Sequence, residues 1–212
     1  MASKGADTKE EKTSGVLPRK EQELFRTLVQ CYEKKLYTKG IKTANAILGK
    51  FPQHGETLSM KGLISNCMGK REEAHELCKQ GLRNGLKSSI TWHVYGLLHK
   101  SDKNIKEASK CYLNALRIDP SNQNILRDLA TLQLQMRDLA GFVLTRRKLL
   151  DARPSVGTSW IAYAVGHYLM GEYGSAHDVI AKFLDGVTAQ DSDKKGSEEK
   201  HAESELLLFQ NK

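Results

Sequence analysis

The chain lacks the segments that mark a secreted or membrane-bound protein. Its apolar runs are far shorter than the ~20 residues that a helix needs to cross a bilayer. Its N-terminal segment, MASKGADTKEEKTSG, contains no apolar signal core. The composition therefore predicts a soluble, cytoplasmic protein with no membrane partner.

Paired cysteines are also missing. The four cysteines form no CxxC pair, whereas zinc sites usually bring their ligands in close local pairs. In a cytoplasmic protein, single cysteines of this kind are typical of a reduced core. The sequence therefore predicts no metal site and buried thiols at Cys31, Cys67, Cys78 and Cys111.

Catalytic motifs are absent as well. The seven histidines are scattered, and the chain contains no HExxH, GxSxG or phosphate-binding GxxxxGK sequence. His93 and His99 fall on one predicted helix, where packing or surface polarity explains them. We therefore predict a binding protein, not an enzyme, that holds no cofactor of its own.

Proline is scarce, and its four positions share one register. Pro18, Pro52, Pro120 and Pro154 are separated by 34, 68 and 34 residues. A period of 34 is typical of tetratricopeptide (TPR) helical hairpins. Because proline cannot continue a helix, each one is expected to mark the end of a repeat.

The period divides the chain into five repeats without insertions or deletions. Position 4 of each repeat holds a large apolar residue, whereas positions 8 and 20 mostly hold small residues that let two helices approach closely. Phe142 breaks this rule at position 20, and the preceding Gly141 is expected to make room for it. The third repeat fits best, with Tyr112 in the aromatic slot of the pattern. The repeats are 21–54, 55–88, 89–122, 123–156 and 157–190.

The predicted fold is all-α: a TPR-type α–α superhelix that forms one elongated array over residues 17–190. Residues 1–16 are expected to be a disordered polar tail, and the charged stretch 191–203 a solvated loop. Residues 204–212 are expected to begin a further, incomplete helix, which predicts a fragment of a longer array or a covering partner. An ordinary helical bundle is the alternative fold.

The first helices of a TPR array line its concave groove, and positions 2, 5, 9 and 12 are expected to point there. These side chains are mixed and largely apolar, which favours a helix or a folded protein as the partner. The clamp of Lys, Asn and Arg that chaperone-binding TPR domains use for acidic C-terminal peptides is absent. Alternatively, some of the apolar residues pack inside the array. The predicted groove residues are Phe25, Val29, Leu63, His93, Leu97, Arg127, Ile161 and Val165.

The net charge of +8 is unevenly distributed. Repeats one to four hold 23 Lys and Arg against 13 Asp and Glu, whereas the fifth repeat carries −2. Basic residues recur in phase on the predicted second helices, which places them in a stripe along the superhelix. Without a base-reading motif, such a stripe favours salt-sensitive contact with an RNA phosphate backbone and no DNA partner. The alternative is a solvated face that keeps the array soluble. The candidate RNA-binding residues are Lys42, Lys79, Arg83, Lys110, Arg117, Arg146, Arg147 and Lys148.

Several segments also contain residues that the repeat pattern leaves free, such as Arg127–Asp128. The segments are HGETLSMKGL (54–63), LKSSITWHVYGLLHKSDK (86–103), NILRDLATLQLQMRDL (124–139), SWIAYAVGHYL (159–169) and SELLLFQNK (204–212). In these segments, and in register from about Leu17 to the last residue, the chain resembles the large auxiliary subunit of the NatA N-terminal acetyltransferase complex.

This resemblance implies a non-catalytic scaffold. In the family, the auxiliary subunit wraps a separate GNAT-fold catalytic subunit, which binds acetyl-CoA, and tunes it toward nascent chains that have lost the initiator Met. The auxiliary subunit also anchors the complex to the ribosome, and the family's basic N-terminal repeats are associated with that contact, in agreement with the basic stripe. Family members continue through many more repeats, so the chain is expected to correspond to their N-terminal portion. The alternative function is a generic TPR adaptor that binds a protein or peptide in its groove without contacting RNA.

Overall fold

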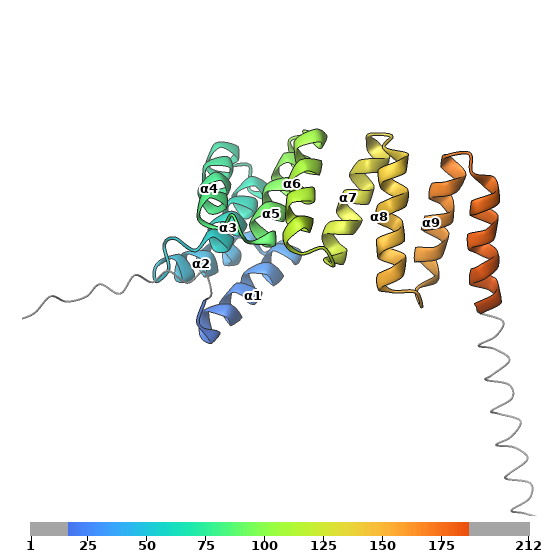
Figure 1. Ribbon diagram of the computed structural model, residues 1–212. Helices are drawn as coiled ribbons and strands as arrows, with labels where there is room; N and C mark the ends of the chain where they lie inside the picture. The colour runs from blue at the N-terminus through green and yellow to red at the C-terminus, as the bar shows by residue number, and fades with distance from the viewer. Residues whose placement is uncertain (1–16, 187–212) are drawn as a thin grey trace, which may run out of the picture. The chain divides into compact units, whose positions relative to one another are not determined.

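The computed structural model describes residues 17–186, and within them the chain forms helices and no strand (Figure 1). The predicted tail at 1–16, the charged loop at 191–203 and the helix start at 204–212 lie outside the described residues. Within residues 17–186, no helix combines the length and the apolarity that crossing a bilayer requires. The helices are α1 (Arg19–Glu33), α2 (Tyr37–Leu48), α3 (Gly55–Cys67), α4 (Arg71–Asn84), α5 (Ser89–Ser101), α6 (Ile105–Ile118), α7 (Gln123–Gln135), α8 (Leu139–Ala152) and α9 (Gly157–Leu169), followed by helical residues 173–186.

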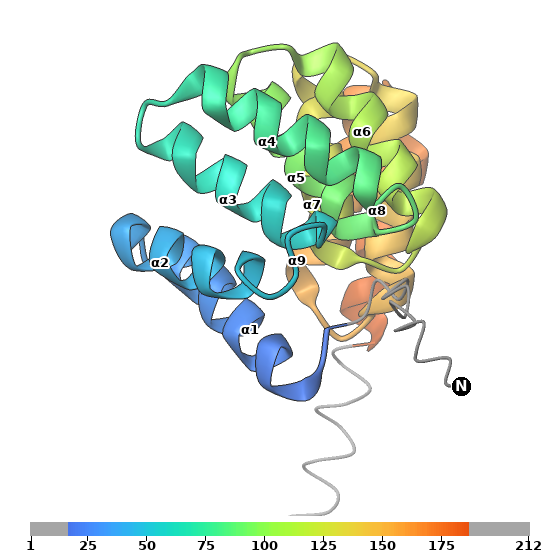
Figure 2. The same ribbon diagram turned by 90° about the vertical axis from the view of Figure 1, so that its left-hand side faces the viewer.

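The helices recur at the period that the prolines predict. First helices begin at residues 55, 89, 123 and 157, and second helices at 37, 71, 105, 139 and 173, each 34 residues after the last. Only α1 departs from this spacing, because it begins at Arg19, directly after Pro18. Each first helix packs against the second helix of its own repeat; α3 and α4 lie side by side in Figure 2. The prediction of an all-α TPR fold is confirmed.

The turn between the two helices of a repeat has the same backbone conformation each time. The residue at position 15 has a positive φ, between 58° and 85°, in all five repeats. The next backbone N–H then donates to the carbonyl five residues earlier, as Asn104 N does to His99 O at 2.9 Å. This hydrogen bond is typical of a Schellman motif, which ends a helix in the left-handed region. Glycine adopts that region without strain at two of these positions, whereas lysine or arginine occupies the other three. The five residues are Lys35, Gly69, Lys103, Arg137 and Gly171.

The described residues divide into two compact units at Pro120, a boundary that the period alone does not predict. The N-terminal unit contains α1 to α6, and the C-terminal unit contains α7 to α9 and the helical residues 173–186.

The N-terminal unit has a continuous apolar core in which small residues sit at the helix contacts. Leu28, Ile64 and Leu98, from the first helices of three successive repeats, are fully buried. A Cβ atom at Gly96 would lie 2.5 Å from Cε1 of Tyr112, so only glycine allows α5 and α6 to approach this closely. This contact confirms the predicted role of the small residue at position 8.

Three of the four cysteines are buried, as predicted, but Cys67 is exposed at the end of α3. The prediction of a buried thiol is wrong there because Cys67 lies in the last turn of the helix, beyond the packed face. Burial raises the pKa of the Cys78 thiol to about 12, so this side chain behaves as a small apolar residue.

The C-terminal unit accommodates a large residue where the repeat usually has a small one. Phe142 is buried on α8, and its ring lies beside Gly166 of α9, where a Cβ atom would come within 3.3 Å of the ring. A Cβ atom at Gly141 would instead collide with the side chains of Asp138 and Gln133. The expectation that Gly141 makes room for Phe142 is therefore wrong, and the space comes from the next repeat.

Candidate interaction surfaces

In the N-terminal unit, the predicted groove residues belong mainly to the core. Leu63 is only 3% exposed and lies in the central apolar cluster, so its assignment to a binding surface is wrong. Phe25, Val29 and Leu97 are half-buried and pack against the same cluster. His93 is half-buried, with its ring centroid 5.4 Å from that of Tyr112. The period places these residues in the expected register, but their side chains are used for packing between the repeats.

In the C-terminal unit, the same register positions are exposed. Ile161 is 52% exposed and Val165 is 45% exposed, and Arg127 is exposed on α7. Tyr168, at the next groove position of α9, is 62% exposed, and Leu134 of α7 is exposed as well. Residues 161, 165 and 168 share one face of a helix because they are four and three residues apart. The C-terminal unit therefore presents an apolar helix face on α9 and an exposed basic residue at a groove position of α7.

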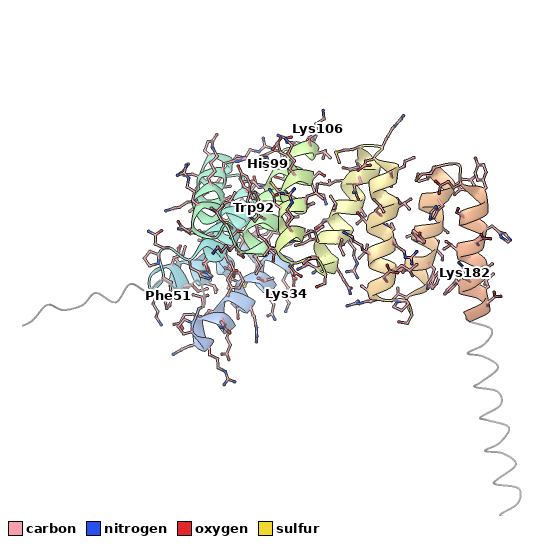
Figure 3. The ribbon with its side chains drawn as sticks, viewed as in Figure 1. Lys34, Phe51, Trp92, His99, Lys106 and Lys182 are labelled. Carbon is pink, nitrogen blue, oxygen red and sulfur yellow. The ribbon has the colours of Figure 1, made fainter. Side chains whose placement is uncertain are left out.

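The candidate RNA-binding residues lie on the second helices, as predicted, and all but one are exposed. Lysines on these helices project outward, as Lys106 of α6 does in Figure 3. The N-terminal unit contributes one from α2, two from α4 and two from α6, and the C-terminal unit contributes two from α8. The exposed candidates are Lys42, Lys79, Arg83, Lys110, Arg117, Arg147 and Lys148.

Some of these cations are partly neutralised by their neighbours. Lys110 Nζ donates to Glu107 Oε1 at 2.7 Å, and this carboxylate raises the pKa of Lys110. Arg147 Nε donates to Asp151 Oδ1 at 2.9 Å. Both pairs are exposed, so each is weak and screened by salt, and each cation remains available to a phosphate.

The exception is Arg146, whose side chain is not exposed. Its side chain is half-buried, and its guanidinium carbon lies 5.0 Å from the centroid of the Phe142 ring. Its Nε is buried without a hydrogen-bond partner among the described residues. Burial, and secondarily the positive charge of Arg127, lowers the pKa of Arg146. The sequence placed Arg146 in the stripe by its helix, but its position within the repeat points it inward.

A polar cluster joins α4 to α5, and sequence reasoning did not find it. His75 Nε2 lies 2.7 Å from Asp102 Oδ2, and the ring centroid of His99 lies 6.2 Å from that of His75. Tyr95 packs edge-on against His99 at a centroid distance of 4.5 Å. Burial lowers the pKa of His99. The cluster ties successive repeats together; within residues 17–186, no group of three or more His, Cys, Asp and Glu is arranged to hold a metal ion.

Helical hairpins in this strict register define a tetratricopeptide-repeat protein. The family model described as Psidin, N-terminal TPR repeats region, matches residues 22–141. N-alpha-acetyltransferase 16, NatA auxiliary subunit, of Mus musculus is 50% identical over 197 residues, which cover 92% of this chain and 22% of that protein. The N-terminal acetyltransferase A complex auxiliary subunit NAA15 of Arabidopsis thaliana is 50% identical over 193 residues, 91% of this chain and 21% of that protein. The chain therefore belongs to the family of NatA auxiliary subunits, and it spans about a fifth of the length of the curated relatives it matches.

Solved structures agree with this assignment. A structure of Naa15/Naa10 bound to HypK-THB matches with a TM-score of 0.70 and 46% identity, over 79% of this chain and 25% of that chain. PilF of Pseudomonas aeruginosa matches with a TM-score of 0.62 at 16% identity, over 78% of this chain and 76% of that chain. At that identity, the second match shows the TPR fold alone.

Proposed function

We propose that the chain acts as a non-catalytic auxiliary subunit that binds a catalytic N-terminal acetyltransferase subunit and anchors it to the ribosome. There the complex would acetylate nascent chains in the cytoplasm during translation. The observation that carries the proposal is the 50% identity, over 92% of the chain, to a protein named as a NatA auxiliary subunit. In the solved structure, the similar protein Naa15 is found together with Naa10.

Ribosome contact is supported by charge and exposure. The N-terminal unit presents five exposed candidate cations on its second helices, where phosphate groups can reach them. Each contact with an RNA phosphate releases counterions, so the affinity should fall steeply between about 50 and 200 mM salt. Acetyl-CoA would be bound by the catalytic subunit, and this chain would hold no cofactor and bind neither DNA nor membrane.

The test is co-sedimentation of the full chain with ribosomes. Reversing Lys79, Arg83 and Arg117 to Glu should reduce the bound fraction at low salt by about tenfold or more, because three phosphate contacts become repulsive. The matched control reverses Lys20, Arg26 and Lys34, which carry the same charge but lie on α1 or immediately after it. Equal sedimentation of the two triple variants would overturn the assignment of the second helices to RNA.

A generic TPR adaptor is the second candidate function, favoured by the exposed apolar face of α9. It predicts capture of protein partners without ribosomes and without an acetyltransferase subunit. Acetyl transfer by the purified chain alone would contradict both proposals, since both assign the chain a binding role.

A further inference from the structure

Position 24 of the repeat is buried in the first three repeats, but in the fourth repeat it holds a charged residue. In the first three repeats this position holds Ala44, Cys78 and Tyr112, all buried. In the fourth repeat it holds Arg146. The TPR pattern favours an aromatic residue there, so a guanidinium replaces a core side chain.

The residue at position 24 packs against the residue at position 5 of the first helix in the same repeat. The Cys78 thiol donates to the Ser59 carbonyl at 3.5 Å in the second repeat. In the third repeat, the rings of His93 and Tyr112 make the equivalent contact. The same two positions of the fourth repeat hold Arg127 and Arg146, so the register brings two positive charges together where other repeats place groups that can pack.

Neither arginine is neutralised by the described part of the chain. Arg127 donates to the amide oxygen of Asn124 at 3.3 Å, and Arg146 stacks on Phe142 with its Nε unsatisfied. The next residue, Arg147, does form an ion pair, with Asp151. The two positive charges repel each other, and the half-buried guanidinium of Arg146 has lost part of its hydration. An anion bound between the two guanidiniums would offset both effects.

The surroundings indicate which kind of anion fits. Groove positions of α7 and α9, in the same unit as Arg127, are apolar and exposed at Leu134, Ile161, Val165 and Tyr168. A guanidinium binds carboxylates and phosphates bidentately alike, so the exposed apolar side chains decide between the two: a helix can cover them, whereas a hydrated RNA backbone cannot. An apolar helix face in turn suits the apolar face of a second helix.

We propose that Arg127 and Arg146 bind a side-chain carboxylate of a protein partner, carried on a helix whose apolar residues cover Ile161, Val165 and Tyr168. This surface goes beyond the proposed function, since it requires neither ribosome contact nor acetyltransferase activity. It differs from the carboxylate clamp of chaperone-binding TPR domains, because that clamp uses the first helices alone, whereas here one arginine comes from a second helix.

The test measures binding of a fluorescent peptide to the full chain at 150 mM salt. The probe is a 16-residue amphipathic helix with leucines at i, i+3, i+4 and i+7 and two flanking glutamates. Its control has glutamine in place of both glutamates. The variant Arg127→Met/Arg146→Met removes both charges at similar side-chain length, and Arg147→Met is its matched control because it removes a neighbouring cation that is already paired.

The glutamate peptide should bind the double variant at least tenfold more weakly than the unaltered chain, and Arg147→Met should change its affinity by less than twofold. The glutamine peptide should bind the unaltered chain about as weakly as the glutamate peptide binds the double variant. The glutamine peptide should bind the double variant no more weakly than that, because the peptide change and the arginine changes remove the same interaction. If the double variant does not fold, Arg127→Met alone, at an exposed position, should still weaken the glutamate peptide at least threefold.

The proposal would be overturned if the two peptides bound the unaltered chain with equal affinity. It would also be overturned if the glutamate peptide bound the double variant as tightly as it binds the unaltered chain. A 16-nucleotide single-stranded RNA is the competitor. If it displaces the peptide and itself loses affinity in the double variant, the site binds phosphate and the proposal fails. Ribosome co-sedimentation of Arg127→Met/Arg146→Met should be unchanged, which separates this site from the proposed ribosome contact.

Discussion

The two units use the same repeat register in opposite ways. At position 9 of the first helices, the N-terminal unit holds Val29, Leu63 and Leu97, which are buried or half-buried, whereas the C-terminal unit exposes Val165. In the N-terminal unit, α3 packs on α5, so groove positions become core. In the C-terminal unit, α9 packs on α8 around Phe142 and Gly166. Register alone therefore does not separate core from binding surface; the neighbouring helices that pack on each first helix also decide it.

The largest expected effect on stability comes from truncating the side chain at position 9, which is buried in one unit and exposed in the other. Leu63→Ala should lower the free energy of unfolding of the N-terminal unit by about 3 kcal/mol, because it leaves a cavity in a packed core. Val165→Ala, at the equivalent exposed position, should change the C-terminal unit by less than about 0.5 kcal/mol. Urea unfolding measures each unit separately, because Trp92 reports on the first and Trp160 on the second once the other tryptophan is replaced by phenylalanine. Similar losses in the two units would contradict the contrast.

A gain of about 1 kcal/mol is expected for Arg146→Met in the C-terminal unit. The variant removes a half-buried charge that has no carboxylate partner and keeps an apolar side chain over Phe142. Arg147→Met should give no gain, since its charge is exposed and paired. The measurement is the unfolding midpoint followed by Trp160 fluorescence. A loss of stability for Arg146→Met would show that the guanidinium is a structural group.

Introducing glycine at position 15 should have a smaller effect, in the same direction in both units. Lys103→Gly and Arg137→Gly place glycine in the left-handed region and should stabilise their units by about 0.5 kcal/mol, since relief of strain outweighs the added freedom of the unfolded chain. Gly69→Ala should destabilise by about 1 kcal/mol for the converse reason. Thermal unfolding checks the signs. Destabilisation by both glycine variants would mean that the turn is held by the lysine and arginine side chains.

The smallest effect is a pH dependence of the stability of the N-terminal unit. Burial lowers the pKa of His99, and the charge of His75 lowers it further, while Glu107 and Asp102 act in the opposite direction. The unfolded chain therefore binds the proton first, so stability is complete above the ordinary histidine pKa of about 6.5 and declines as pH falls below it. His99→Gln should flatten this decline by a few tenths of a kcal/mol between about pH 6.5 and 5. If the stability of the variant declined by the same amount over this pH range, titratable groups other than His99 would be responsible.

The proline period predicted the helices and their starts, because proline and the small residues at positions 8 and 20 act locally. It could not predict the exposure of Val165 or the burial of Leu63, since both depend on which neighbouring helices touch. The inward position of Arg146 could have been inferred from the sequence, because Tyr112 fills the same repeat position in the preceding repeat and is buried there. The His75–Asp102 pair joins residues 27 positions apart and leaves no local signal.

Affinity purification of the full chain from cell extract, at low and at high salt, tests the proposed scaffold role most directly. We expect ribosomes to be recovered at low salt and lost at high salt, because phosphate contacts are salt-sensitive. We expect a catalytic acetyltransferase subunit to be recovered at both salt concentrations. Recovery of other proteins with neither ribosomes nor an acetyltransferase subunit at low salt would contradict it.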